Sequence, residues 1–195
     1  MKTWLGLKNE PVVLYTGNFE SYQGVEMLVA AAAAAAVKIP DLRVVAVGGE
    51  PEQIEKIRKM AVAARIEKNI IFTGKRSMSE IPLFKSLASV LISPRLKGTN
   101  VPMKIYSYLY SGKPIVATRI LSHTQVLDDE TAILVEPEAA ALGAGIIRAL
   151  EDMEQSKKIA QNARRLAETK FSRKIYEEKV REAFRFLEES LNTPR

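Results

Sequence analysis

Cysteine is absent from the 195 residues, and histidine occurs only once, as His123. The first absence excludes disulfide bonds and thiolate metal sites. The second excludes metal sites built from several histidines and leaves at most one imidazole for catalysis. No apolar run approaches the roughly 20 residues that a membrane-spanning helix needs, and the N-terminus lacks the basic and then apolar pattern of a secretory signal. We therefore expect a cytoplasmic protein.

The chain also lacks a dense block of one charge. Lysine and arginine number 29 and aspartate and glutamate 23, a formal net charge of +6, but the basic residues are spread along the whole sequence. Such a distribution is typical of solvated helix faces, so we expect no nucleic-acid partner. Peripheral contact with the inner face of a membrane is an alternative that no residue pattern supports.

Short apolar runs are present, and they alternate with helical patterns. This alternation predicts a parallel sheet with helices on both faces, and a composition of 47% hydrophobic and 27% charged residues is that of a globular domain. We expect an α/β fold of the Rossmann-like three-layer α/β/α type with a six-stranded parallel sheet. The strands are predicted at 12–16, 42–47, 70–73, 90–93, 115–117 and 132–135.

Helical patterns fill the intervals and the C-terminal third. Residues 1–10 show no pattern, and we interpret them as a linker or tail before a domain at 11–172. The segment 173–195 is predicted to be a separate amphipathic helix. The other helices are predicted at 22–39, 51–65, 138–152 and 154–170, with a short one from the capping-box pair Ser77 and Glu80 to about Leu87.

The segment from Ser93 to Thr118 carries the clearest chemical signal. A strand that ends in Ser-Pro is followed by the polar loop 98–100 and by a helix opening on Pro102, where the missing amide would be unpaired anyway. A glycine-bearing loop leading to a helix N-terminus binds anions. Lys104 lies in the first turn, where the helix dipole disfavours a cation by roughly 0.3–1 kcal/mol, and a phosphate beside it would explain the charge. We therefore predict a cradle for a nucleotide diphosphate.

Other polar turns follow the predicted strands, at 17–18, 48–49, 74–76 and 122–123. Ligands of parallel sheets bind beyond the carboxyl ends of the strands, so these turns are expected on one face. Neither the dinucleotide fingerprint G-x-G-x-x-G nor the phosphate loop G-x-x-x-x-G-K-[ST] is present. Ser111-Gly112-Lys113 has the ending of such a loop, but it precedes a strand and is rejected.

The order of these motifs, with GKPIVAT, then SHTQVL and AILVEP, resembles the donor-binding half of GT-B glycosyltransferases of the retaining family 4 type. The resemblance extends from about Val12 to Ser172. It implies a C-terminal domain that binds a nucleotide-diphospho-sugar and passes the sugar to a sugar or lipid-linked acceptor held by a missing N-terminal domain. The helix from Lys174 would return to that domain, residues 1–10 would be the interdomain linker, and the isolated domain would be inactive alone.

The resemblance also implies site residues. The two glutamates of the family's donor loop fall on Thr99, near the donor sugar, and on Ser107, near the ribose. The Arg and Lys that clamp the diphosphate fall on Asn18 and Gln23. The predicted donor- and diphosphate-binding residues are Gly17, Asn18, Gln23, Arg76, Arg95, Lys97, Gly98, Thr99, Asn100, Val101, Lys104 and Ser107, with Arg119 as a further candidate cation. Thr99 and His123 are the candidate catalytic residues, and no metal or other cofactor is predicted.

Two other functions stay open at this point. One is a binding module that has lost catalysis, which the neutral residues at 18, 23, 99 and 107 favour. The other is a nucleotide-sugar epimerase of the GT-B fold, whose acid and base residues are poorly represented. For His123, a donor-loop contact and a merely packed loop histidine are equally open. Of Tyr106, Tyr108 and Tyr110, at least one is expected in the core, because alternating helix positions point to different faces.

Overall fold

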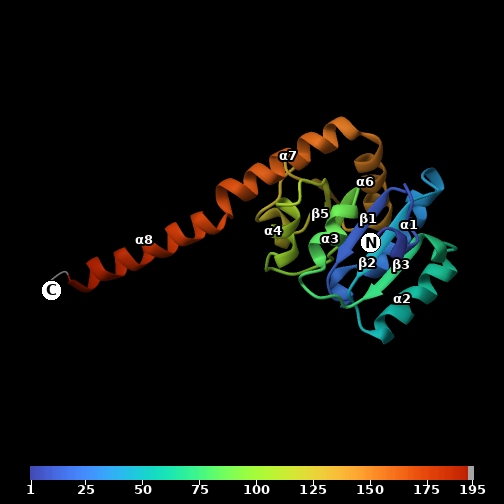
Figure 1. Ribbon diagram of the computed structural model, residues 1–195, viewed down its shortest axis with the longest axis horizontal. Coiled ribbons are helices and arrows are strands. Elements are labelled where there is room, and N and C mark those ends of the chain that lie inside the picture. The colour runs from blue at the N-terminus through green and yellow to red at the C-terminus, as the bar shows by residue number, and fades with distance from the viewer. Residues whose placement is uncertain (193–195) are drawn as a thin grey trace.

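A six-stranded parallel sheet forms the centre of the protein, and helices cover both of its faces (Figure 1). The computed structural model describes residues 1–192, with side chains as far as Glu188. The strand order is β3-β2-β1-β4-β5-β6. Successive strands are therefore added in one direction from β1 to β3 and in the opposite direction from β4 to β6. The predicted fold class is confirmed. The strands are β1 (Val12–Thr16), β2 (Arg43–Val47), β3 (Ile70–Gly74), β4 (Val90–Ser93), β5 (Ile115–Thr118) and β6 (Ile133–Val135).

The helices lie close to their predicted positions, with two differences at their starts. A 3₁₀ turn, Ser21–Gln23, precedes the first helix and ends at Gly24, whose φ of 72° is left-handed, so the helix starts three residues later than predicted. Ser77 N donates to Glu80, but residues 78–80 form a turn and the helix begins at Ile81. The helices are α1 (Val25–Lys38), α2 (Pro51–Ala63), α3 (Ile81–Leu87), α4 (Met103–Leu109), α5 (Leu121–Thr124), α6 (Ala139–Glu151), α7 (Met153–Lys170) and α8 (Arg173–Asn192).

Each face of the sheet has its own hydrophobic core, because successive strand residues point to opposite faces. On β1, Val13 and Tyr15 pack with α1, α2 and α6, whereas Val12 and Leu14 pack with α3, α4 and α7. The alanine run of α1 packs closely against α6: a Cβ on Gly143 would lie 2.9 Å from the carbonyl oxygen of Ala31. Small residues on both helices therefore set this short separation.

The two terminal segments differ in how they meet this body. In the N-terminal segment, a 3₁₀ turn at Thr3–Leu5 leads to Leu7, and Leu5 and Leu7 are both buried in the second core. The helix α8 instead extends away from the sheet (Figure 1), and Tyr176 and Phe184 on it are 68% and 61% exposed. Residues 193–195 of the predicted C-terminal segment lie outside the described residues. The linker role of residues 1–10 stays a prediction.

None of the helices within residues 1–192 combines the length and the apolar character that crossing a membrane requires.

Candidate functional site

A cavity of about 880 Å³ opens beyond the carboxyl ends of β1, β2 and β3. Its walls come from the segments 16–20, 47–53, 75–81 and 103–110. A second cavity, of about 1210 Å³, lies at the opposite edge, where Pro11, Ser89 and Pro114 precede their strands. Of the predicted polar turns, those at 17–18, 48–49 and 75–76 line the first cavity, which is where ligands of parallel sheets are expected, whereas residues 98–100 and 122–123 do not.

The floor of this cavity is backbone, because glycine lets two turns approach closely. Gly17 and Gly48 have φ angles of 146° and 120°. A Cβ on Gly48 would lie 1.9 Å from the carbonyl oxygen of Gly17, so no other residue fits there. The helix α4 is tied to the same point, since Thr16 N donates to the hydroxyl of Tyr108, 3.0 Å away. Tyr108 is buried, which confirms that one of the three tyrosines belongs to the core.

Lys104 reaches across from α4 to this floor. Its Nζ lies 3.2 Å from Oε1 of the buried Gln23 and 4.1 Å from the centroid of the Tyr15 ring. Within residues 1–188, no carboxylate lies at ion-pair distance from the ammonium group. Burial, with a smaller contribution from the charge of Arg95, lowers the pKa of Lys104 to about 7. The cavity therefore contains a partly desolvated cation that lacks a counter-charge.

The other cations at the cavity are paired. Lys75 forms an ion pair with Glu50, and Nη1 of Arg76 lies 3.9 Å from Oε1 of Glu80. The carboxylate of Glu20 accepts a hydrogen bond from Gln53, at 3.0 Å. Among the cations that line this cavity, Lys104 is therefore the one that has no carboxylate partner within residues 1–188.

The predicted loop at 95–101 has a different organisation. The guanidinium of Arg95 donates to the carbonyl oxygens of Lys97 and Asn100, at 2.8 and 3.3 Å, and so holds its own loop. Glycine suits position 98, because its φ of 136° is one that other residues rarely adopt and because a Cβ there would displace the guanidinium of Arg95. The side-chain amide of Gln125 donates to the carbonyl oxygen of Thr99. None of the residues from 95 to 101 lines the cavity, and their predicted donor contacts stay predictions.

His123 lies behind this loop and is fully buried. Its Nδ1 is 2.8 Å from the carbonyl oxygen of Thr118, which only accepts, so Nδ1 carries the proton and Nε2 accepts from Ser93 Oγ at 2.9 Å. Burial lowers the pKa of His123 to about 4, which keeps the ring neutral at pH 7. This geometry corresponds to the packed-histidine interpretation, and a catalytic role for His123 or Thr99 stays a prediction.

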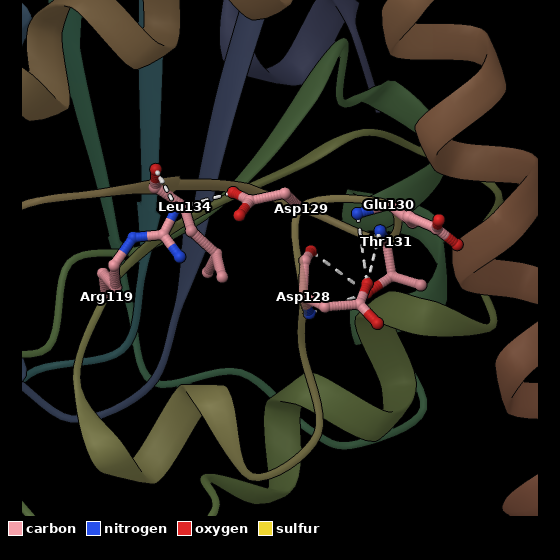
Figure 2. A network of polar contacts seen from close by, with 6 residues as sticks. All are labelled: Arg119, Asp128, Asp129, Glu130, Thr131 and Leu134. Atoms are coloured by element: carbon pink, nitrogen blue, oxygen red, sulfur yellow. Dashed lines mark hydrogen bonds and ion pairs between the residues drawn. The ribbon is translucent and has the colours of Figure 1, made fainter.

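Arg119, the further candidate cation, is also engaged (Figure 2). Its Nη2 donates to Asp129 Oδ1 at 2.6 Å and lies 3.5 Å from the carbonyl oxygen of Leu134. The neighbouring turn is closed by Asp128, whose Oδ1 accepts from the backbone and hydroxyl of Thr131, at 3.0 and 2.7 Å. The charge of Arg119 is therefore neutralised by Asp129, in the connection between β5 and β6.

The structure thus divides the predicted site residues into groups. Those that line the cavity are Gly17, Asn18, Arg76, Lys104 and Ser107. Gln23 touches Lys104, and the hydroxyl of Ser107 donates to the carbonyl oxygen of Lys104 at 3.0 Å. Sequence reasoning did not identify Glu50 and Gln53, which line the cavity after β2. The turn at Gly48-Gly49 before them was the available signal.

Proteins of known activity resemble this chain. The family model for glycosyl transferases group 1 matches residues 3–166. Alpha-D-kanosaminyltransferase of Streptomyces kanamyceticus is 27% identical over 86% of this chain and 43% of its own length. The GDP-mannose-dependent alpha-(1-6)-phosphatidylinositol monomannoside mannosyltransferase of Mycolicibacterium smegmatis is 27% identical over 70% of this chain and 37% of its own. The chain spans less than half the length of these two relatives.

Solved structures share the fold. Sucrose-phosphate synthase from Thermosynechococcus elongatus superposes with a TM-score of 0.84 at 25% identity, over 97% of this chain and 48% of that one. HepE from Anabaena, in complex with UDP, superposes with a TM-score of 0.86 at 21% identity, over 94% of this chain and 50% of HepE. The C-terminal domain of the group 1 glycosyl transferase LpcC from Francisella tularensis superposes with a TM-score of 0.74 at 22% identity. The match covers 84% of this chain and 87% of that domain.

Proposed function

Since the chain belongs to the family of glycosyl transferases group 1, we propose that it binds the nucleotide-diphospho-sugar donor of a retaining glycosyltransferase. The observation that carries this proposal is Lys104, the cation at the cavity that no carboxylate within residues 1–188 neutralises. The relatives support the donor class, because the mycobacterial mannosyltransferase is GDP-mannose-dependent and HepE was also solved in complex with UDP-glucose.

The chemistry of sugar transfer explains why such a cation is needed. Cleaving the bond between sugar and diphosphate leaves negative charge on the departing phosphate, and fixed positive groups aimed at that charge stabilise the transition state. Lys104 stands beside Gly17, whose missing side chain leaves room at the cavity floor: a Cβ there would lie 3.3 Å from Nζ. A phosphate at this point would hold the ammonium in its protonated form.

No metal ion is included in this proposal. Within residues 1–188, no group of three or more histidine, aspartate or glutamate side chains is placed to hold one. We assign the charge compensation to Lys104 and to the free amides that begin α4.

A second half would supply the acceptor. The helix α8 carries Tyr176, Phe184 and Leu187 largely exposed, on the end of the chain that leaves the sheet (Figure 1). Spacings of three and eight residues place these side chains along one side of the helix. We assign this apolar face to an acceptor-binding domain, with a sugar or lipid-linked acceptor, in a cytoplasmic enzyme.

Calorimetric titration with UDP, GDP and ADP tests the donor site. We expect one of these diphosphates to bind, and Lys104→Met to weaken it about ten- to hundredfold, as a lost hydrogen bond to a charged group of roughly 1.5–3 kcal/mol implies. Lys157→Met is the matched control, because Lys157 is exposed on α7 at the opposite cavity. Equal affinity in the wild type and Lys104→Met, or no binding of any diphosphate, contradicts the proposal. Binding without sugar transfer, once an acceptor half is supplied, favours the non-catalytic module.

A further inference from the structure

Lys104 is held at the cavity floor by two neutral groups. Its Nζ lies 4.1 Å from the centroid of the Tyr15 ring and donates to Oε1 of Gln23, 3.2 Å away. The proposed function uses the charge of Lys104 but does not explain what positions it. Since no carboxylate within residues 1–188 pairs with Nζ, the aromatic ring and the amide oxygen are the groups that fix its place.

The ring of Tyr15 is itself immobile. Tyr15 lies in β1 and is fully buried, and its ring meets Phe19 edge-on, with 5.9 Å between the centroids. The Tyr15 hydroxyl donates to the carbonyl oxygen of Asn18 at 2.6 Å. Burial raises the pKa of this hydroxyl, which therefore stays protonated and remains a donor. The ring cannot turn away from the ammonium group without breaking this hydrogen bond.

Glycine at position 17 keeps the contact between ammonium and ring open. A Cβ on Gly17 would lie 3.3 Å from Lys104 Nζ and 3.4 Å from Cζ of Tyr15. A side chain at this position would therefore press on both groups. The hydrogen bond from Thr16 N to the Tyr108 hydroxyl ties β1 to α4 beside this contact, so the backbone also holds the two partners together.

An aromatic ring and a carboxylate hold a cation with different consequences. A carboxylate neutralises the cation and then competes with an incoming anion. The face of a ring attracts the cation through its quadrupole, but the ring carries no net charge. The ammonium of Lys104 has three N–H donors, and Gln23 accepts one of them. Burial lowers the pKa of Lys104 to about 7, so the charged form benefits from an attraction that leaves its net charge to a ligand.

We propose that Tyr15 is the positioning residue of the diphosphate site: its ring face holds the Lys104 ammonium in place of a carboxylate and leaves the charge available to the ligand. The inference rests on the proposed function and deepens it, because it names the group that orients the cation on which that function depends. The role belongs to the ring face, and the hydroxyl only fixes the ring.

Ring fluorination tests this role, because fluorine withdraws electrons from the ring face while the ring keeps its shape. Tyr15→Phe is the reference, and mono-, di- and trifluorophenylalanine are then placed at position 15. Calorimetry follows whichever of UDP, GDP and ADP binds best. Tyr15→Phe should keep most of the wild-type affinity, and each added fluorine should weaken binding by a similar factor, about two- to thirtyfold in all. A ring that only fills space would give equal affinities across the series.

The same fluorinated residues at position 84 are the matched control. Phe84 is also buried, but it lies on α3 in the hydrophobic core of the opposite face of the sheet, so its fluorination should leave the affinity unchanged. Thermal unfolding shows that each variant is folded. Proton NMR of the wild type without ligand reports the contact directly: the ε-methylene resonances of Lys104, assigned by comparison with Lys104→Met, should be shifted upfield by the ring current of Tyr15.

Equal affinities across the series at position 15, or an unshifted ε-methylene of Lys104, overturn the inference while the proposed function stands. The inference is also overturned if fluorination at position 84 weakens binding as much, because that result indicates a general sensitivity of the core. Failure of the proposed function is a different outcome: no diphosphate then binds to the wild type, and this inference fails with it even where the ring-current shift is present.

Discussion

The two sides of the sheet's carboxyl edge treat their polar groups in opposite ways. Over β1 to β3, the cavity contains the cation Lys104 and the buried donor Nε of Arg76, and neither has a carboxylate or an acceptor, respectively, within residues 1–188. Over β4 and β5, His123 has a partner at each ring nitrogen, and Arg95 donates hydrogen bonds to the backbone of its own loop. The exception on the second side is Ser122, whose buried Oγ has no partner within residues 1–188. We therefore expect a ligand where unused bonding capacity is combined with an open cavity, as it is over β1 to β3.

The largest effect that separates the two sides is expected from His123→Ala. Removing a buried ring costs roughly 3 kcal/mol or more, and Ser93 Oγ loses its partner at a further cost of about 1 kcal/mol. For a chain of this size, the sum of about 4 kcal/mol lowers the Tm by roughly 10 °C. Differential scanning calorimetry measures the shift. Thr124→Ala, an exposed change on the same helix α5, is the control and should leave the Tm nearly unchanged.

A wild-type Tm in His123→Ala, combined with loss of sugar transfer in the full transferase, would reverse this interpretation. His123 would then act on the donor, as the sequence resemblance implies.

The same histidine should make the free energy of unfolding depend on pH in the acidic range. Its pKa is about 4 in the folded chain and is expected near 6.5 in the unfolded chain, so the unfolded state binds more protons between these values. The stability that the neutral ring contributes is complete above pH 6.5 and is lost as the pH falls towards 4, by about 3 kcal/mol in all. In urea unfolding at pH 7, 6, 5 and 4, the difference in the free energy of unfolding between wild type and His123→Ala should narrow by this amount. A constant gap contradicts the assignment.

On the other side, Lys104 should make nucleotide binding weaker as the pH rises above 7. The pKa of its ammonium is about 7 in the free protein, and a bound phosphate favours the protonated form, so binding takes up a proton above pH 7. The dissociation constant should rise by up to about tenfold per pH unit, and by about fiftyfold between pH 7, where half of the ammonium is protonated, and pH 9. In Lys104→Arg the cation does not titrate in this range, and its calorimetric affinities should be flat. Parallel curves for the two proteins would refute the role of Lys104.

Much of the fold was predictable from the sequence because its signals are local. The strands are short apolar runs bounded by glycine, proline or polar residues, and each was placed to within a residue or two of its observed ends. The start of α1 was missed because Gly24 adopts a left-handed φ, which depends on its packing: a Cβ there would lie 1.9 Å from the carbonyl oxygen of Pro94. That contact joins segments 70 residues apart, and no local pattern encodes it.

The candidate site was predictable only in part, for the same reason. Lys104 was identified from its position in a helix's first turn, which is local information. Whether Arg119 or Arg95 keeps a free charge depends on Asp129 and on the carbonyl oxygen of Asn100, which the folded chain brings to them. The stacking of Trp4 on Arg76 likewise joins the N-terminus to the turn after β3.

The smallest expected effect concerns Gln125, which closes the loop side by donating to the carbonyl oxygens of Thr99 and Leu121. Because the amide is exposed, Gln125→Ala should lower the free energy of unfolding by only about 1 kcal/mol, the net worth of an ordinary hydrogen bond. The local effect should be larger than the global one: amide hydrogen exchange should quicken between residues 97 and 101 while β1 and β2 keep their protection, since loops open independently of core strands. Unchanged exchange in that loop would mean that Arg95 alone holds it, and Arg95→Met should then release it.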